Sequence, residues 1–402
     1  MKKLTDTIPE FIKKTNNPDK PLLFLPSEEG DLAEIEEHAN RILTTSTDVL
    51  VIGVGGSSLG AQALIQACGG GQENRPNIHF IDNISPLGFP NILSTVDPHK
   101  THIIAISKSG GTMDLHAHLA IIMDWLSKAK CTYKNHITAI TEAKTSPLRK
   151  LIKTHNLSSL EHLVPLGGRF SLLSNVGLLP AAIAGVNIRE VRQGAQAVIE
   201  EMKAAKSPAD IPAAIGAAHI VSQQQQNNIN ISVLFIYANR LQKFGQWYCQ
   251  LWAESLGKNG LGTTPIIAQG PIDQHSQLQL YMEGPRDKSY SFISIGREEI
   301  PYTIIPELPD DIGVGQLTGL SLHDIVNAMS EGTHHALSET GQPVRQTHIK
   351  EMNEKNIGAL FMHFFLEAKF ASALLDVPLY GQPGVERGKV ITRVFLDKRK
   401  NQ

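Results

Sequence analysis

The stretch DVLVIGVGGSSLGAQALIQA occupies residues 48–67 and decides the fold. Its first eight residues predict a buried strand, the glycines and serines a tight turn, and the last nine residues a helix. Strand patterns recur at 77–82, 101–107 and 136–141, and an amphipathic run lies between the last two at 115–128. Strands that alternate with helices predict parallel βαβ units, because parallel neighbours need crossover connections.

A second series of the same kind follows a helix-rich stretch at about 188–226. The pattern predicts strands and helices in alternation, with strands at 230–238 and 290–296 and helices at 241–258, around 322–332 and near 354–375. The sequence therefore predicts an α/β fold with two doubly wound parallel sheets flanked by helices. A ligand is then expected at the carboxyl ends of the strands.

The expected organisation has four parts. They are an N-terminal helical extension (1–44), a first α/β domain (45–187), a second α/β domain (188–380) and a C-terminal helix (381–402). We find no repeat of fixed period.

Composition narrows the class of protein. The 402 residues carry 37 basic and 39 acidic side chains, a formal net charge of −2, so there is no electrostatic footprint for nucleic acid or an anionic membrane. Three cysteines are too few and too scattered for a disulfide framework. No apolar run follows the N-terminal lysines, and no stretch approaches the roughly 18 apolar residues of a membrane span. A cytoplasmic enzyme is the expectation.

The segment GVGGSSLG, residues 53–60, stands where the first strand meets its helix. Glycines let a ligand approach the backbone, and the N–H groups at a helix start favour an anion. Asp82 ends the next strand, where a dinucleotide-binding protein would hold a ribose. Ser58, however, replaces the third glycine of that fingerprint, and hydroxyls suit a phosphate better. Sugar-phosphate binding, dinucleotide binding and a structural turn all remain open on this segment alone.

The segment SKSGGT, residues 107–112, also follows an apolar strand directly. Three hydroxyls, two glycines and one lysine within six residues can surround a phosphoryl group, with Lys108 supplying charge. The alternative is a polar turn with a solvated lysine. Doubly wound topology would bring this loop close to residues 53–60, which favours the phosphate interpretation.

Further candidates each have a structural alternative. Arg169 lies in GGRFSLLSNVGLLP (167–180), where a surface ion pair would explain it. Gln250 and Glu254 share one helix face, and an i,i+4 pair of Glu254 with Lys258 would be sufficient.

Two more candidates lie towards the C-terminus. His275 falls just inside an expected helix start that Asp273 could cap, and a lone histidine is usually structural. YGQPGVERGK (380–389) reads as a turn and a helix start that carries Gln382 and Lys389. No pair of histidines is completed by a carboxylate or cysteine at a metal-binding spacing, so no metal site is expected.

Taken in order, these segments resemble the glucose-6-phosphate isomerase (phosphoglucose isomerase) family in a compact bacterial-type form. The resemblance covers roughly 48–392. GGRFSLLSNVGLLP and YGQPGVERGK are similar to the two signatures of the family, and AESLGK and DQHSQLQL lie between them. The resemblance implies two sugar isomerase domains, a homodimer with shared active sites, a sugar phosphate as substrate, and no metal or organic cofactor.

The resemblance also implies roles for individual residues. Glu254 would move a proton between C1 and C2 of the open-chain sugar, and Arg169 would stabilise the cis-enediol(ate). His275, from the neighbouring subunit, and Lys389 would open the ring. The remaining positions would bind the phosphate or line the sugar site: Gly56, Ser57, Ser107, Lys108, Ser109, Thr112, Gln250 and Gln382.

The sequence departs from the family pattern at Ser58, Gly111 and Gly381. These departures concern the details of the phosphate contacts and of substrate affinity, and they leave the proposed proton-transfer residues intact. A general base works best with a pKa near the working pH, so Glu254 is expected to be partly desolvated. Two alternatives remain: a dual isomerase that also accepts mannose 6-phosphate, and a non-catalytic sugar-phosphate sensor.

Overall fold

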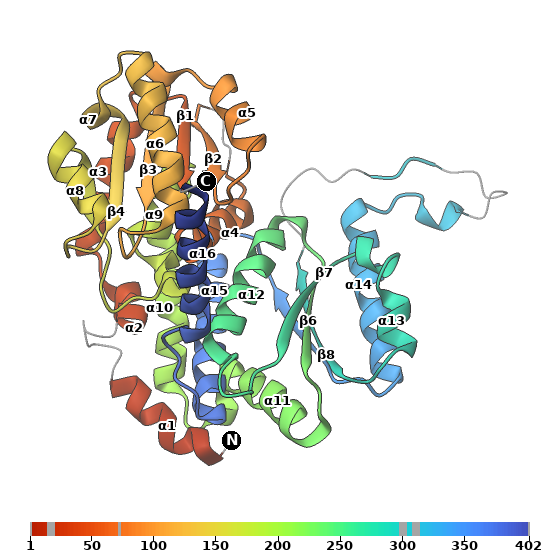
Figure 1. The fold of residues 1–402 in the computed structure, drawn as a ribbon. Helices are drawn as coiled ribbons and strands as arrows, with labels where there is room; N and C mark the ends of the chain where they lie inside the picture. Colours follow the sequence, from red (N-terminus) through yellow and green to blue (C-terminus); the bar gives the residue numbers. More distant parts are fainter. Residues whose placement is uncertain (1, 14–20, 71–73, 297–303, 308–313, 401–402) are drawn as a thin grey trace.

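The computed structural model describes residues 2–13, 21–70, 74–296, 304–307 and 314–400. Within these residues the chain forms a five-stranded sheet of order β2-β1-β3-β4-β5 and a four-stranded sheet of order β7-β6-β8-β9. Neighbouring strands are parallel throughout both sheets. The predicted α/β class with two doubly wound sheets is confirmed (Figure 1).

The strands of the first sheet are β1 (Asp48–Ile52), β2 (Asn77–Ile81), β3 (Thr101–Ile106), β4 (Ile137–Thr141) and β5 (Ser158–Glu161). Those of the second are β6 (Ile231–Ile236), β7 (Thr264–Gln269), β8 (Lys288–Ile295) and β9 (Val344–Ile349).

The helices up to the end of the first sheet are α1 (Lys2–Lys13), α2 (Pro21–Phe24), α3 (Gly30–Leu43), α4 (Leu59–Cys68), α5 (Gly88–Thr95), α6 (Met113–Lys128), α7 (Tyr133–His136), α8 (Pro147–His155) and α9 (Asn175–Ile183). Those that follow are α10 (Ile188–Ala204), α11 (Pro212–Asn227), α12 (Gln242–Leu256), α13 (Leu278–Glu283), α14 (Leu322–Glu339), α15 (Glu354–Leu375) and α16 (Pro383–Lys400).

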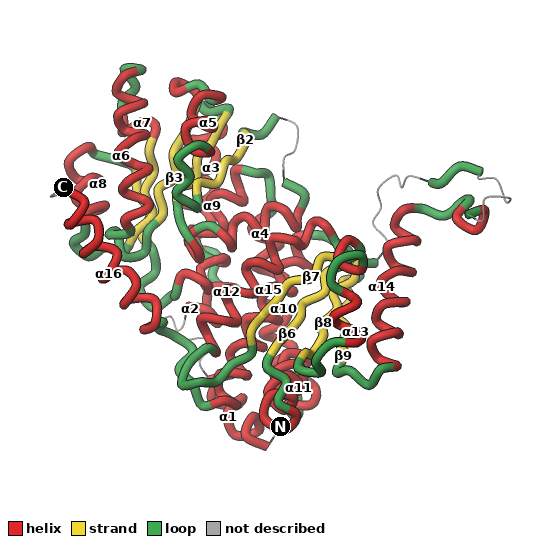
Figure 2. The backbone as a smooth tube through the Cα atoms, turned by 45° about the vertical axis from the view of Figure 1, so that its right-hand side comes forward, coloured by secondary structure: helices red, strands yellow, loops and turns green. Residues whose placement is uncertain are grey.

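The two sheets share one central layer of helices. In β1, Val49 and Val51 face a large core that also contains side chains of α9, α10, α12 and α15, whereas Leu50 and Ile52 face a separate core beneath α6 and α8. The second sheet alternates in the same way, since Leu234 of β6 joins the central core. Figure 2 shows the central helices between the two sheets. This packing brings loops of the first sheet against α12, which precedes β7.

Helix α15 lies in that central layer. Its 22 residues are long and apolar enough to cross a membrane by length and composition alone, contrary to the expectation that no stretch would be. An 18-residue window of it is 72% buried inside the protein, where it packs against α10, α11 and α12. Its apolar character is therefore explained by the core of this fold.

The sequence did not predict three strands: β5, β7 and β9. β7 and β9 are the edges of the second sheet and β5 is one edge of the first, so each pairs on one side only. The sequences of β5 and β9, SSLE and VRQTHI, carry polar side chains at half-exposed positions, and β7, TPIIAQ, is fully buried only at Ala268. A short, partly solvated edge strand lacks the apolar run that marks a buried one.

Candidate active site

The loops after β1 and β3 open into one cavity of about 710 Å³. Its lining combines glycine- and hydroxyl-rich backbone with nine charged side chains from both halves of the chain. The lining residues are Val54, Gly55, Gly56, Ser57, Lys108, Ser109, Gly111, Thr112, Met113, Asp114, Glu142, Lys144, Gly168, Arg169, Gln250, Glu254, Gln382, Val385, Glu386, Lys389 and Arg393. All of the predicted site residues except Ser107 and His275 are in this set.

The loop after β3 is built around Ser107. Its buried hydroxyl lies 2.8 Å from the Thr112 hydroxyl and accepts a hydrogen bond from the Gly110 N–H at 3.1 Å. Gly110 has φ +66°, a left-handed conformation that glycine adopts without strain. Ser107 thus shapes the loop from behind, while Ser109 and Thr112 face the cavity. Thr112 also precedes α6, so the start of a 16-residue helix lies at the cavity.

Lys108 has a carboxylate neighbour that the sequence did not single out. Its ammonium lies 3.7 Å from Glu142, which also pairs with Lys144 at 2.5 Å. Burial lowers the pKa of Lys108, and the charge of Glu142 opposes that shift. The side chain of Glu142 is 5% exposed, and it is placed by the end of β4 beside β3. The contact arises because β3 and β4 are neighbours in the sheet, which the sequence alone does not show.

Gly56 allows two backbone segments to meet. A Cβ atom there would lie 2.1 Å from the carbonyl carbon of Gly168, so no other residue fits without moving the chain. The Ser171 hydroxyl donates to the Gly56 carbonyl at 3.2 Å. Ser171 and Gly168 belong to the 3₁₀ segment Gly168–Leu173, which carries Arg169. The close approach therefore sets the first glycine loop beside the arginine.

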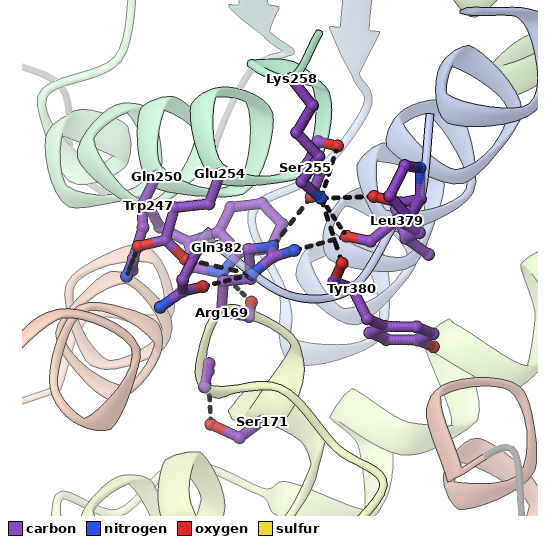
Figure 3. A network of polar contacts seen from close by, with 12 residues as sticks. Arg169, Ser171, Trp247, Gln250, Glu254, Ser255, Lys258, Leu379, Tyr380 and Gln382 are labelled. Carbon is purple, nitrogen blue, oxygen red and sulfur yellow. Dashed lines mark hydrogen bonds and ion pairs between the residues drawn. The ribbon is translucent and has the colours of Figure 1, made fainter. Parts of the chain in front are cut away.

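Arg169 is the most fully enclosed cation of the cavity, with a side chain only 2% exposed. Its guanidinium donates to Glu254 Oε2 at 3.1 Å, to Ser255 Oγ at 2.9 Å and to Gln382 Oε1 at 2.9 Å (Figure 3). Burial lowers the pKa of Arg169, and the charge of Glu254 opposes that shift. A guanidinium keeps its proton even when buried, so the group stays a cation. The Trp247 indole also donates to the Arg169 carbonyl at 3.2 Å.

Glu254 lies in the last turn of α12 and is held through both carboxylate oxygens. Oε2 faces Arg169, while Oε1 accepts from Gln250 Nε2 at 3.1 Å, one helical turn earlier. Its side chain is 22% exposed, in line with the expected partial desolvation. The alternative in which Glu254 pairs with Lys258 is wrong, because Lys258 points elsewhere (Figure 3).

Lys258 instead fixes the segment that leads into α16. Its ammonium donates to the carbonyls of Pro378, Leu379 and Tyr380, and to that of Ser255 at 3.2 Å. The Leu379 carbonyl also accepts from the Arg169 guanidinium. These contacts tie residues 378–382 to the end of α12 and thereby place Gln382 against Arg169. The sequence showed the lysine, but three of its partners are backbone carbonyls some 120 residues away.

Lys389 enters the cavity from α16. Its side chain is 55% exposed and pairs with Glu386 at 2.7 Å on the same helix. Arg393 follows one turn later and also lines the cavity. Gly381, where φ is +79°, precedes the helix and has open space around it.

His275 lies outside this cavity in the single chain. It is exposed and follows the short 3₁₀ segment Ile272–Gln274, so the expected helix start at His275 is wrong; α13 begins at Leu278. Asp273 accepts from the Gln269 N–H at 2.6 Å and from the Ser276 hydroxyl at 2.7 Å. These contacts stabilise the loop after β7.

The dinucleotide interpretation finds no support at Asp82. Its carboxylate accepts from Gln62 Nε2 at 2.7 Å, and the same nitrogen donates to the buried Ser58 hydroxyl at 2.6 Å. Ser58 therefore belongs to the packing of α4 and stays clear of the cavity. Among the described residues, no three His, Cys, Asp or Glu side chains are placed to hold a metal ion.

The cavity thus pairs the Glu254 carboxylate with a fixed guanidinium and is also lined by the hydroxyl-rich loop after β3. The comparisons with known proteins give the family. The model of the phosphoglucose isomerase family matches residues 36–285, and the chain belongs to that family.

Similar proteins and solved structures support the same family assignment. A glucose-6-phosphate isomerase of Rubrobacter xylanophilus is 36% identical over 378 residues, covering 92% of this chain and 87% of that protein. One from Thermus thermophilus is 35% identical over 356 residues, covering 87% and 83%. The crystal structure of a hypothetical protein from Thermus thermophilus has a TM-score of 0.88 at 32% identity, covering 98% and 94%. A Chlamydia trachomatis glucose-6-phosphate isomerase shares the fold, with a TM-score of 0.81 at 19% identity over 92% and 74%.

Proposed function

We propose that the protein interconverts glucose 6-phosphate and fructose 6-phosphate through an open-chain sugar and a cis-enediolate. The observation that carries the proposal is the contact between Glu254 and Arg169 in a cavity that Ser109, Gly111 and Thr112 also line. Family membership supports the same substrate class.

Glu254 is the proposed base. Each of its oxygens accepts one hydrogen bond, and a carboxylate offers about four acceptor positions, so about two remain and either can take a proton. A single carboxylate above the C1–C2 bond can take the proton from one carbon and return it to the other. Partial burial limits competition from water, and the fixed hydrogen bonds limit the motion needed during transfer.

Arg169 is the proposed electrostatic partner of the enediolate. Its hydrogen bonds to Ser255 and Gln382 fix the plane of the guanidinium before substrate arrives. A preorganised cation in a water-poor site stabilises developing negative charge without reorganisation. An arginine suits this place because it keeps its charge when buried.

The phosphate is the proposed ligand of the wall formed by Ser57, Lys108, Ser109 and Thr112, with Ser107 supporting the loop. The start of α6 adds backbone N–H groups to that wall. Because the phosphoryl group lies away from the reacting carbons, its binding energy serves to position them.

Ring opening is proposed to use Lys389 and a His275 from a second copy of the chain. The exposed position of His275, outside the cavity of its own chain, supports a shared site. Helix α16 also exposes an apolar face that a second copy would cover: Val390, Ile391, Val394 and Phe395. A homodimer is thus part of the proposal.

The proposal is tested by incubating the protein with fructose 6-phosphate in heavy water, without added metal, and following products by NMR. Glucose 6-phosphate that carries deuterium at C2 is expected. Mannose 6-phosphate as a second product would mark a dual isomerase, and the absence of any exchange would leave a binding protein.

A further inference from the structure

A second cavity, of about 670 Å³, lies at the opposite edge of the first sheet. It opens where strands begin, since His102 is the second residue of β3 and Ser158 the first of β5, whereas the active site lies where strands end. The lining residues are Arg41, Ile42, Thr45, Ser46, His99, His102, Lys134, Asn135, His136, Asn156, Leu157 and Ser158. This set shares no member with the active-site lining.

The charges of this cavity have one sign. Arg41 and Lys134 line it, and no aspartate or glutamate is among the described residues that do so. His102 adds no charge, because burial lowers its pKa to about 3. The active-site cavity, in contrast, mixes its cations with four carboxylates: Asp114, Glu142, Glu254 and Glu386. A concave surface with charge of one sign concentrates ligands of the other.

Arg41 is held in place by two contacts, and both Arg41 and Lys134 keep free donors. Arg41 Nη2 contacts His38 Nδ1 and Ser158 Oγ, each at 2.8 Å, which holds the guanidinium at the start of β5. Among the described residues, its other two nitrogens have no hydrogen-bond partner. The Lys134 ammonium, on α7, likewise makes no ion pair with any residue in the described ranges. Both groups can therefore donate to a ligand.

The C-terminus of α3 lies at this cavity, and its partial negative charge repels an anion only weakly. A helix C-terminus carries partial negative charge on its last carbonyls. Here the Arg41 carbonyl accepts from the Thr44 hydroxyl at 2.9 Å, and the Ile42 carbonyl accepts from the N–H groups of Thr45 and Ser46 at 3.2 and 3.0 Å. Those carbonyls are satisfied by the turn itself, and the full charges of Arg41 and Lys134 dominate.

We propose that this cavity is a second anion site, distinct from the active site, that binds the phosphoryl group of a small molecule between Arg41 and Lys134. The Nε–H and Nη1–H groups of Arg41 can each donate a single charge-assisted hydrogen bond to a phosphoryl oxygen, and the Lys134 ammonium adds a point charge. Hydroxyl and amide groups of Thr45, Ser46 and Asn135 line the remaining wall. The volume is in the range of small-molecule sites, about 300–1,000 Å³.

The test uses inorganic pyrophosphate as probe and isothermal titration calorimetry as readout. Lys108→Gln serves as background, because it weakens anion binding at the active-site loop and leaves the second cavity intact. Pyrophosphate binding is expected to persist in this background. Adding Arg41→Gln, or separately Lys134→Gln, is expected to weaken it about tenfold or more, the loss of a charge-assisted hydrogen bond.

Lys128→Gln is the matched control, since that lysine is 77% exposed and pairs with Asp124 away from the cavity. It is expected to leave the dissociation constant unchanged, and circular dichroism verifies the fold of every variant. The proposal is wrong if the Lys108→Gln protein does not bind pyrophosphate. It is equally wrong if Arg41→Gln and Lys134→Gln both leave binding unaltered. Neither result bears on isomerisation.

Discussion

The two ends of the active-site cavity are built differently. At one end, the Arg169 side chain is 2% exposed and contacts Glu254, Ser255 and Gln382. At the other, Lys389 is 55% exposed and pairs with Glu386 on the same surface helix. The buried end is rigid and complete within one chain, as charge stabilisation requires. The exposed end is held by fewer contacts, and under the proposal His275 of a second copy would complete it.

This difference predicts that the buried end controls turnover most strongly. Glu254→Gln keeps the shape and both hydrogen-bonding partners in reach but removes the base, so turnover is expected to fall about 10³–10⁴-fold. Binding of fructose 6-phosphate, measured by calorimetry, is expected to change little. Glu386→Gln, which changes a carboxylate of the exposed end, is the matched control. A comparable loss of turnover in that variant would contradict the prediction that the buried end controls turnover most strongly.

Arg169→Lys keeps a positive charge but loses the planar fork that contacts several partners. We expect kcat to fall about 100-fold with a much smaller change in KM, because the interaction is strongest in the enediolate. Steady-state kinetics measures both constants, and thermal unfolding checks the fold. A rise in KM alone would assign Arg169 to ground-state binding.

A substitution in the proposed phosphate site is expected to lower kcat/KM by less than the changes at Glu254 and Arg169. Lys108→Gln removes one charged donor, so kcat/KM should fall about tenfold or more, mainly through KM. Lys153→Gln, an exposed lysine on α8, serves as control and should behave as wild type. An unchanged KM in Lys108→Gln would remove this residue from the phosphate site.

Lys389→Gln tests the exposed end. Because the Lys389 side chain is 55% exposed, the unfolding temperature should stay as in wild type, while turnover of the cyclic sugar should fall about tenfold through weaker acid–base assistance. Lys398→Gln on the same helix is the control. Equal rates for Lys389→Gln and wild type would show that ring opening does not use this ammonium.

The smallest expected effect is a change of substrate affinity with pH. Burial lowers the pKa of Lys108, so its ammonium loses its proton at a lower pH than an ordinary lysine. Affinity for the phosphate should therefore fall as pH rises through that lowered pKa. Lys108→Arg stays charged and should flatten the alkaline rise in KM. The same alkaline rise in both proteins would assign it to another group.

The fold was predictable where strands are buried on both faces, because their apolar runs and following glycine loops are visible in sequence. It was not predictable for β5 and β9, whose polar, half-exposed residues resemble loops. Within the site, it was predictable that the loops after β1 and β3 lie close together, because the carboxyl ends of parallel strands lie at the same edge of a sheet. The contacts of Glu142 with Lys108 and of Ser255 with Arg169 were not, since they depend on how distant elements pack.

One isotope measurement tests most directly whether a single side chain serves both carbons. Glucose 6-phosphate labelled with deuterium at C2 is converted in ordinary water, and the label at C1 of fructose 6-phosphate is followed by NMR. The wild-type protein is expected to move part of the label from C2 to C1, and Glu254→Gln to move almost none. If the label is instead lost to solvent without ever reaching C1, at a rate that Glu254→Gln leaves unchanged, Glu254 is not the base.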